Sequence, residues 1–164
     1  MNTQKPQITC TKKYIDLPFA HRQPNHTGHC AWLHGHDWSF EFTFAAKELD
    51  ECGFVVDFGR LKPLKALLEE FDHALVLNTD DPWLTHLKFH LVDATDTISD
   101  DNPECRDLAN IIEVPDCSAE GLAVYFLEKA SQLIEEITGG RATVTKVVVA
   151  EDSKNTATAA TPNA

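Results

Sequence analysis

The chain has 164 residues, of which 43% are hydrophobic and 24% charged, and this balance predicts one globular domain with an ordinary core. Its formal net charge of −12 argues against a nucleic-acid partner, because a nucleic-acid surface needs a basic stripe. No apolar run approaches the roughly 20 residues of a membrane helix, so we expect no membrane segment.

The first part of the chain contains the clearest strand pattern. Residues 7–20 are rich in β-branched and aromatic side chains and predict a strand, whereas residues 21–35 contain Pro, Asn and Gly and predict a loop. Residues 36–46 alternate apolar and polar side chains, which predicts a strand with one buried face. Residues 54–58 follow a turn, and we expect them to pair back as the second arm of a hairpin.

Two helices are expected after these strands. The first begins after Asp57, a suitable N-cap, and carries an apolar stripe at three- and four-residue steps from residue 58 to 71. Pro63 lies in its first turns, where a proline can kink a helix. The second helix begins near Ser118 and stops at the glycines 139 and 140. Residues 142–151 predict a final strand.

The segment 79–117 fits neither a helix nor a strand pattern, and it contains an acidic cluster at residues 93–104. A loop of this length in a compact domain is usually a functional lid or disordered. The polar tail after residue 151 predicts either a weak edge strand or disorder. We therefore expect a single domain over residues 1–164 with a long loop insertion at about 79–117.

The five cysteines are odd in number and form no CxxC pair; they are Cys10, Cys30, Cys52, Cys105 and Cys117. The first ten residues contain no apolar stretch of the kind found in a signal peptide. Together these features predict free thiols in a reducing cytosol, and hence a cytoplasmic protein.

A histidine pair suggests a metal site. On an extended backbone, residues i and i+2 point to one face, so His34 and His36 can offer both imidazoles to one ion. A catalytic zinc site needs three protein ligands and an open fourth position. His21, at the end of the first strand, is the best third candidate, and His26 and His29 are rivals. The alternative is that the HxH spacing arose by chance in a chain with eight histidines.

Cys30 and the Asp72–His73 pair each allow two interpretations. Cys30 could be a fourth metal ligand, or a thiol made reactive by a nearby cation, and spacing does not decide between them. Asp72 could orient His73 so that the imidazole takes a proton from a thiol. Alternatively, the pair caps a helix end at the surface.

Several motifs occur in a fixed order over residues 19–151. They are FAHR (His21), CAWLHGH (Cys30, His34, His36), VVDFGRLK (Asp57), FDHALVLN (Asp72, His73), CSAEGLAVYF (Glu120) and VVVAE (Glu151). On these motifs the chain resembles the 6-pyruvoyltetrahydropterin synthase family, which includes the 6-carboxytetrahydropterin synthases of the queuosine and deazapurine pathway. The resemblance implies an α+β tunnelling fold (T-fold), with a four-stranded antiparallel sheet and two helices on one face. It also implies homo-oligomers in which trimers close a barrel and two trimers stack into a hexamer.

The resemblance further implies a zinc-dependent lyase acting on 7,8-dihydroneopterin triphosphate, a small pterin substrate. The implied zinc ligands are His21, His34 and His36. The metal would acidify the side-chain hydroxyls of the substrate and stabilise the charge left by proton loss. Cys30 would be the general base and not a ligand, and Asp72 would fix the tautomer of His73 in a proton relay.

The same resemblance implies residues that bind the pterin ring. Glu151 would accept hydrogen bonds from the ring N–H and amino groups, a pairing that is strong and orientation-specific. Ser118 and Glu120 match the family's Thr-x-Glu start of the second helix, whose N–H groups can also help bind the ring.

Some features depart from the family pattern. The loop over residues 79–113 is longer than in short bacterial members, and the strand after Glu151 lacks the family's tyrosine. Basic residues for a triphosphate are few, and those nearest the site in sequence are Lys12, Lys13 and Arg22.

Three functions are compatible with these motifs. The spacing of Cys30 before the HGH motif and the short loop from His21 to Cys30 resemble those of bacterial carboxy-type enzymes. The carboxy-type enzyme releases acetaldehyde and triphosphate and leaves 6-carboxytetrahydropterin. The alternative is the pyruvoyl-type enzyme, which eliminates triphosphate. A non-catalytic, zinc-containing pterin-binding oligomer is the third, and Cys30, Asp72 and His73 argue against it because a binder needs none of them.

Overall fold

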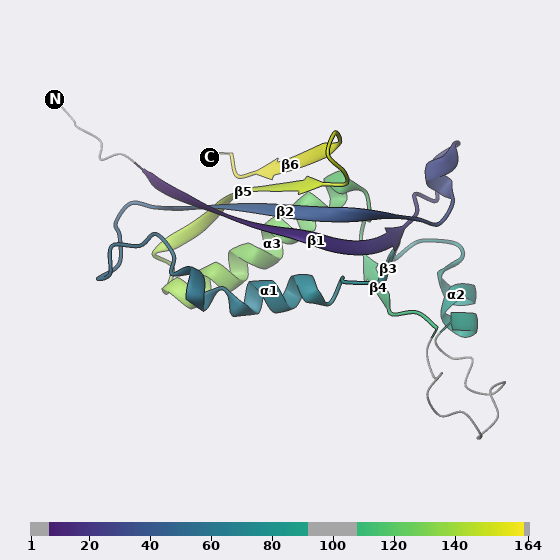
Figure 1. The fold of residues 1–164 in the computed structure, drawn as a ribbon, viewed down its shortest axis with the longest axis horizontal. Helices are drawn as coiled ribbons and strands as arrows, with labels where there is room; N and C mark the ends of the chain where they lie inside the picture. The colour runs from purple at the N-terminus through teal and green to yellow at the C-terminus, as the bar shows by residue number, and fades with distance from the viewer. Residues whose placement is uncertain (1–6, 92–107, 163–164) are drawn as a thin grey trace, which may run out of the picture.

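A computed structural model describes residues 7–91 and 108–162, which form one sheet with helices packed on it (Figure 1). The strands are β1 (Ile8–His21), β2 (His34–Ala46), β3 (Leu75–Asn78), β4 (Ile111–Val114), β5 (Ala142–Ala150) and β6 (Thr156–Ala160). The α-helices are α1 (Lys62–Glu69), α2 (Leu84–Leu91) and α3 (Ala119–Thr138), and short 3-10 turns occur at His29–Ala31 and Phe58–Arg60. Within this part of the chain, no helix combines the length and the apolar character needed to span a membrane.

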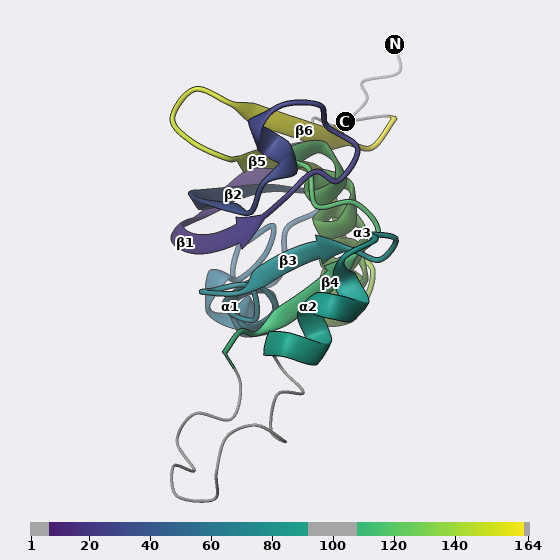
Figure 2. The ribbon, with the colours of Figure 1, turned by 90° about the vertical axis from the view of Figure 1, so that its right-hand side faces the viewer.

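The expected α+β class, an antiparallel sheet with helices on one face, is confirmed. The strand order is β4-β3-β1-β2-β5-β6, and β1, β2, β5 and β6 pair antiparallel. The short strands β3 and β4 extend the sheet beyond β1 with parallel pairing, so the described sheet has six strands where four were predicted. Figure 1 shows α1 and α3 on the same face of the sheet, and Figure 2 shows α2 beside β3 and β4.

The core forms because β2 presents a continuous row of aromatic side chains to α3. Trp38, Phe40, Phe42 and Phe44 lie on one face of β2 and are fully buried. The Phe40 ring lies 4.6 Å from the Phe126 ring of α3, centroid to centroid. Burying a large apolar side chain contributes roughly 1.5–3 kcal/mol, so this row fixes which face of β2 turns inward.

The predicted strand over residues 54–58 is wrong. β2 already pairs with β1 along one edge and with β5 along the other as far as Ala46, so a returning segment has no free edge to join. The guanidinium of Arg141 donates hydrogen bonds to the carbonyls of Phe54 (3.2 Å) and Val55 (2.9 Å) instead. These backbone groups are therefore satisfied without a strand partner.

Both predicted helices occur, with one change at the first. Asp57 caps the 3-10 turn at Phe58–Arg60 by accepting a hydrogen bond from the Gly59 N–H at 2.8 Å, and α1 begins only afterwards. Pro63 lies in the first turn of α1, where its missing N–H costs no helical hydrogen bond. The start and stop of α3 are confirmed: Ser118 caps its N-terminus, and Gly139 ends it in a left-handed conformation with φ of 63°.

The segment 79–117 contains more regular structure than expected, because α2 and β4 both lie within it. The acidic cluster at residues 93–104 lies outside the described residues. The tail after Glu151 adopts the first of its two expected forms, since β6 pairs with β5 as an edge strand. The division into a single domain over residues 1–164 with an insertion stays a prediction.

Candidate active site

Three histidines meet where β1 ends and β2 begins. His21 and His34 are direct partners across the two strands, and His36 lies two residues further on the same face of β2. Their ring centroids are 4.6 Å apart for His21–His34, 5.4 Å for His21–His36 and 5.0 Å for His34–His36. The rivals His26 and His29 lie in the connecting loop and are exposed.

Trp38 forms the floor beneath these rings. Its indole is fully buried, and its centroid lies 4.9 Å from the His21 ring and 5.5 Å from the His36 ring. The indole N–H donates to the Phe19 carbonyl at 3.3 Å, which fixes the plane of the floor. The histidines thus continue the aromatic row of β2 at the end of the core.

Two of the imidazoles are oriented by main-chain carbonyls. His21 Nδ1 lies 2.8 Å from the Cys117 carbonyl, and His34 Nδ1 lies 2.7 Å from the Trp32 carbonyl. A carbonyl oxygen can only accept, so each Nδ1 must carry the proton and donate it. The Nε2 atoms are left facing the centre of the cluster, as in a metal-binding histidine.

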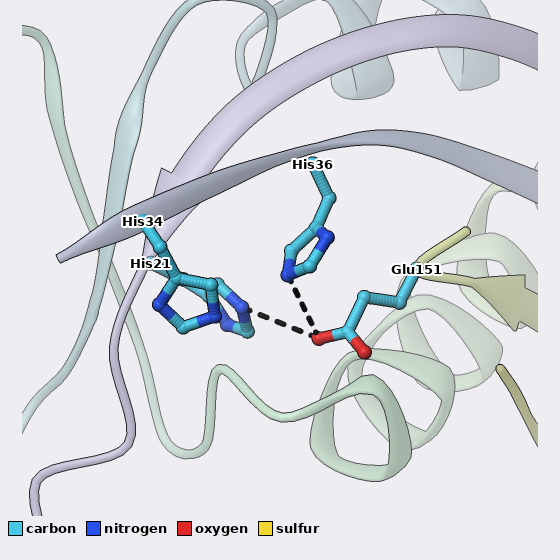
Figure 3. Close-up of side chains that lie close together, drawn as sticks. All are labelled: His21, His34, His36 and Glu151. Carbon is cyan, nitrogen blue, oxygen red and sulfur yellow. Dashed lines mark ion pairs between the residues drawn. The ribbon is translucent and has the colours of Figure 1, made fainter. Parts of the chain in front are cut away.

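A carboxylate completes the group. Glu151, directly after β5, places its Oε1 3.4 Å from His21 Nε2 and 3.3 Å from His36 Nε2 (Figure 3). Ligand atoms of His21, His34, His36 and Glu151 all lie within 4.8 Å of one another. Four donor groups from three strand ends therefore converge on one point.

The charges of this cluster suit a cation. Burial, reinforced by His34 and His36 and opposed by the hydrogen bond to Cys117, lowers the pKa of His21 from 6.5 to about 4. His21 is thus neutral at neutral pH, and its Nε2 lone pair faces the Glu151 carboxylate without a proton between them. The Nε2 atoms of His21 and His36 are buried and have no hydrogen-bond partner in the described chain. Zinc fits such a site, because neutral imidazole and carboxylate are its usual ligands besides thiolate.

Glu151 lies closer to the expected metal ligands than the resemblance implies. The resemblance makes it a hydrogen-bond acceptor for the substrate ring, whereas its Oε1 points at the imidazoles of His21 and His36. The sequence could not indicate this, because Glu151 is 115 positions beyond His36 along the chain and reaches it only through the pairing of β5 with β2.

Cys30 lies near this cluster in sequence but is not one of the converging groups. It belongs to the 3-10 turn at His29–Ala31, and its carbonyl accepts a hydrogen bond from the Gln23 N–H at 2.7 Å. Its thiol is free and partly exposed. Among the described residues, the donor cluster is formed without it.

Asp72 and His73 form the expected pair but remain at the surface. His73 Nδ1 lies 2.7 Å from Asp72 Oδ1, and the two side chains are 81% and 42% exposed, respectively. The His73 backbone is left-handed, with φ of 58°, and its N–H donates to the Pro18 carbonyl of β1 at 2.7 Å. The pair is therefore fixed beside β1, but it does not contact the histidine cluster within one chain.

Ser118 and Glu120 lie at the start of α3, next to the cluster. Ser118 Oγ accepts a hydrogen bond from the Gly121 N–H at 3.0 Å, so its hydroxyl caps the helix. Glu120 is exposed in the first turn of α3. The carbonyl of the preceding residue, Cys117, accepts a hydrogen bond from His21, so the N-terminus of α3 lies beside a candidate metal ligand.

Of the three basic residues considered for a triphosphate, only Arg22 adjoins the cluster. Its Nε lies 3.4 Å from Oδ2 of Asp81, whose side chain is fully buried. Lys12 lies instead over the rings of Tyr14 and Phe58.

Sequence reasoning missed the residues that hold the cluster in place. Cys117 supplies the carbonyl for His21, and buried Asn78 accepts a hydrogen bond from the Cys117 N–H at 2.8 Å. These contacts span 96 and 39 positions, so no local pattern indicates them. The only local signal for Asn78 was a polar residue directly after the apolar residues of β3.

Comparison with known proteins identifies the family to which the chain is similar. A family model described as 6-pyruvoyl tetrahydropterin synthase matches residues 9–162. The 6-carboxy-5,6,7,8-tetrahydropterin synthase of Aquifex aeolicus is 33% identical over 131 residues, which cover 78% of this chain and 74% of that enzyme. The enzyme of the same name from Rickettsia bellii is 46% identical over 76 residues, or 45% of this chain and 54% of the relative. The chain thus spans about half the length of the Rickettsia relatives it matches.

Solved structures agree in fold. An uncharacterized protein from Wolinella succinogenes superposes with a TM-score of 0.78 at 22% identity, covering 94% of this chain and 98% of that one. A 6-pyruvoyltetrahydropterin synthase mutant from Plasmodium vivax gives a TM-score of 0.61 at 23% identity, covering 94% and 97%. The expected T-fold is confirmed by this likeness.

Proposed function

Because the chain belongs to the 6-pyruvoyl tetrahydropterin synthase family, we propose that it is a zinc-dependent lyase of the carboxy type. It converts 7,8-dihydroneopterin triphosphate and water to 6-carboxy-5,6,7,8-tetrahydropterin with release of acetaldehyde and triphosphate, in the queuosine and deazapurine pathway. The observation that carries the proposal is the convergence of ligand atoms from His21, His34, His36 and Glu151, among which the Nε2 atoms of His21 and His36 are buried without a hydrogen-bond partner in the described chain. The names of the Aquifex and Rickettsia relatives favour the carboxy-type product.

The three histidines would hold the metal, and the Nδ1 contacts of His21 and His34 keep these two rings aimed at it. Bound zinc would acidify the substrate side-chain hydroxyls and stabilise negative charge after proton loss. His21, being neutral, offers its Nε2 lone pair without first releasing a proton. The Glu151 carboxylate adds a negative charge beside His21 and His36, and this charge offsets the positive charge of the ion. The same carboxylate accepts a hydrogen bond from a substrate hydroxyl.

Proton transfer falls to Cys30, Asp72 and His73. Cys30 removes a proton from the substrate, and Asp72 keeps His73 in the tautomer whose Nε2 can take that proton onward. The relay needs shelter from bulk water, because an imidazole that is 81% exposed exchanges protons freely with solvent. In the proposed oligomer a neighbouring copy can cover this surface.

Ring binding is assigned to the start of α3, and Glu151 is the alternative that the family resemblance implies. Glu120 is the better placed of the two carboxylates, since it is exposed and free to accept ring N–H groups, while Glu151 Oε1 faces imidazoles. Ser118 contributes by capping the helix, which leaves the N–H groups of the first turn oriented toward a ligand.

A homo-oligomer, a trimer or a dimer of trimers, is the expected assembly. The sheet ends in β4 on one side and β6 on the other, and neither outer edge has a strand partner in the described chain. Joining such edges between copies would close a barrel and satisfy their backbone groups. Light scattering coupled to size-exclusion chromatography tests this, and a monomer would contradict it. Free thiols at Cys10, Cys30, Cys52 and Cys117 agree with the proposed cytoplasmic location.

Product identification tests the function. Zinc-loaded protein is incubated with 7,8-dihydroneopterin triphosphate, and the pterin products and acetaldehyde are identified by mass spectrometry. We expect 6-carboxytetrahydropterin and equimolar acetaldehyde. A pyruvoyl product without acetaldehyde would assign the protein to the pyruvoyl type. Pterin binding without turnover would show that the protein is a non-catalytic pterin binder.

A further inference from the structure

A chain of buried hydrogen bonds reaches the candidate metal ligand His21 from outside the cluster. Asn78, at the end of β3, accepts through Oδ1 from the Cys117 N–H at 2.8 Å. The carbonyl of the same residue, Cys117, accepts from His21 Nδ1 at 2.8 Å. The main chain of a single residue, Cys117, therefore connects the Asn78 amide to the imidazole, and both hydrogen bonds are buried.

Cys117 is held at a third point by its thiol. Its Sγ donates to the Arg22 carbonyl at 3.1 Å. This bond connects the segment before α3 to the residue that follows His21. Burial raises the pKa of the Cys117 thiol to about 11, so the group stays protonated and remains a donor at neutral pH. Cys117 thus holds one fixed position between the end of β1 and the end of β3.

The histidines differ in how their second ring nitrogen is supported. His34 bonds the carbonyl of Trp32, only two residues away and at an exposed position. His21 depends on a carbonyl 96 positions further along the chain, which belongs to a segment without regular structure just before α3. Such a carbonyl keeps its place only if the segment is anchored, and Asn78 supplies that anchor from the strand beside β1.

We propose that Asn78 is a positioning residue for metal binding, acting on His21 through the main chain of Cys117. This inference rests on the proposed metal site but not on the proposed reaction. By holding the Cys117 carbonyl against Nδ1, Asn78 keeps the proton on Nδ1 and the lone pair on Nε2. Contacts of this kind around a ligating histidine typically change metal affinity by about 10–100-fold when removed.

Three variants isolate the amide oxygen. Asn78→Ala removes the acceptor, and Asn78→Asp keeps an acceptor in the same place. Asn110→Ala removes an exposed amide that donates to the Glu70 carbonyl at 3.1 Å. Zinc affinity is measured by competition with a chromophoric chelator. We expect Asn78→Ala to bind zinc about 10–100-fold more weakly, with Asn78→Asp and Asn110→Ala close to wild type. Asn78→Ser, whose hydroxyl falls short of the Cys117 N–H, replaces Asn78→Ala if the latter does not fold.

A second measurement on the metal-free protein separates positioning from general destabilisation. Long-range nitrogen–proton correlation spectra report which ring nitrogen of each histidine carries the proton. We expect His21 to be protonated on Nδ1 in the wild type and to become a mixture of tautomers in Asn78→Ala, while His34 stays unchanged. Wild-type zinc affinity together with an unchanged His21 tautomer in the folded variant would overturn the proposal. Neither readout depends on turnover, so an incorrect assignment of the reaction would leave both results interpretable.

Discussion

His21 and His34 are direct partners across β1 and β2, with their ring centroids 4.6 Å apart. This pairing brings two candidate metal ligands together at the ends of two strands, because cross-strand partners share a face of the sheet. A slip of one residue in the register would turn His34 and His36 to the opposite face. The aromatic row beginning at Trp38 prevents such a slip, since it would expose every buried ring of β2.

The first prediction concerns metal content. We expect about one zinc per subunit, and His34→Ala should lose most of it because a catalytic site needs three protein ligands. Elemental analysis of purified protein measures the zinc. His26→Ala is the matched control, since His26 lies in the neighbouring loop and should keep the metal. Full occupancy in His34→Ala would refute the ligand assignment.

A second prediction separates the general base from the ligands. Cys30→Ala should retain its zinc and lose turnover by about 10²–10⁴-fold, the usual contribution of a general base. Steady-state assays and elemental analysis on the same preparation give both values. Cys52→Ala, which removes an exposed thiol from the turn after β2, should change neither. Loss of zinc from Cys30→Ala would make Cys30 a ligand.

Replacing Glu120 should affect pterin binding, whereas replacing Glu151 should affect zinc binding. Glu120→Gln should weaken the binding of a non-reactive pterin by about 1.5–3 kcal/mol, because an amide accepts at only one of two paired donors. Glu151→Gln should instead release zinc faster to a chelator, since it removes a negative charge 3.3 Å from His36 Nε2. The family resemblance instead implied that Glu151 binds the pterin ring.

Calorimetric titration of both variants measures pterin affinity, and challenge with a chelator measures zinc release. Together they test the separate roles of Glu120 and Glu151. If Glu151→Gln binds pterin weakly and keeps its zinc, the assignment implied by the family resemblance holds, and the carboxylate turns away from the imidazoles when the ring enters. Equal pterin affinity in Glu120→Gln and wild type would remove Glu120 from the ring site.

The parts of the fold that follow from short-range patterns could be predicted. The alternation of β2 and the caps of α3 depend on neighbours within a few residues, and His34 and His36 share a face for the same reason. Competition between segments could not be predicted. Residues 54–58 have a good strand pattern, yet β5 occupies the edge of β2 that they would need.

Short elements and distant contacts were missed for a related reason. β3 and β4 have four residues each, too few to show a period, and they are stable only because each adds to an existing sheet edge. The contact between Asn78 and Cys117 depends on where these strands end, so it follows from tertiary structure and not from spacing.

The last prediction concerns Cys117 as a protonated donor. Burial raises the pKa of its thiol from 9.0 to about 11, so the reactive thiolate is scarce in the folded protein. At a pH of about 8, iodoacetamide should therefore label exposed Cys52 well before Cys117, and peptide mass spectrometry with time should show the difference. Labelling of Cys117 as fast as Cys52 in the folded protein would contradict this. The same shift lowers the free energy of unfolding as pH rises from about 9 towards 11, because the unfolded thiol releases its proton in that range and the folded one does not.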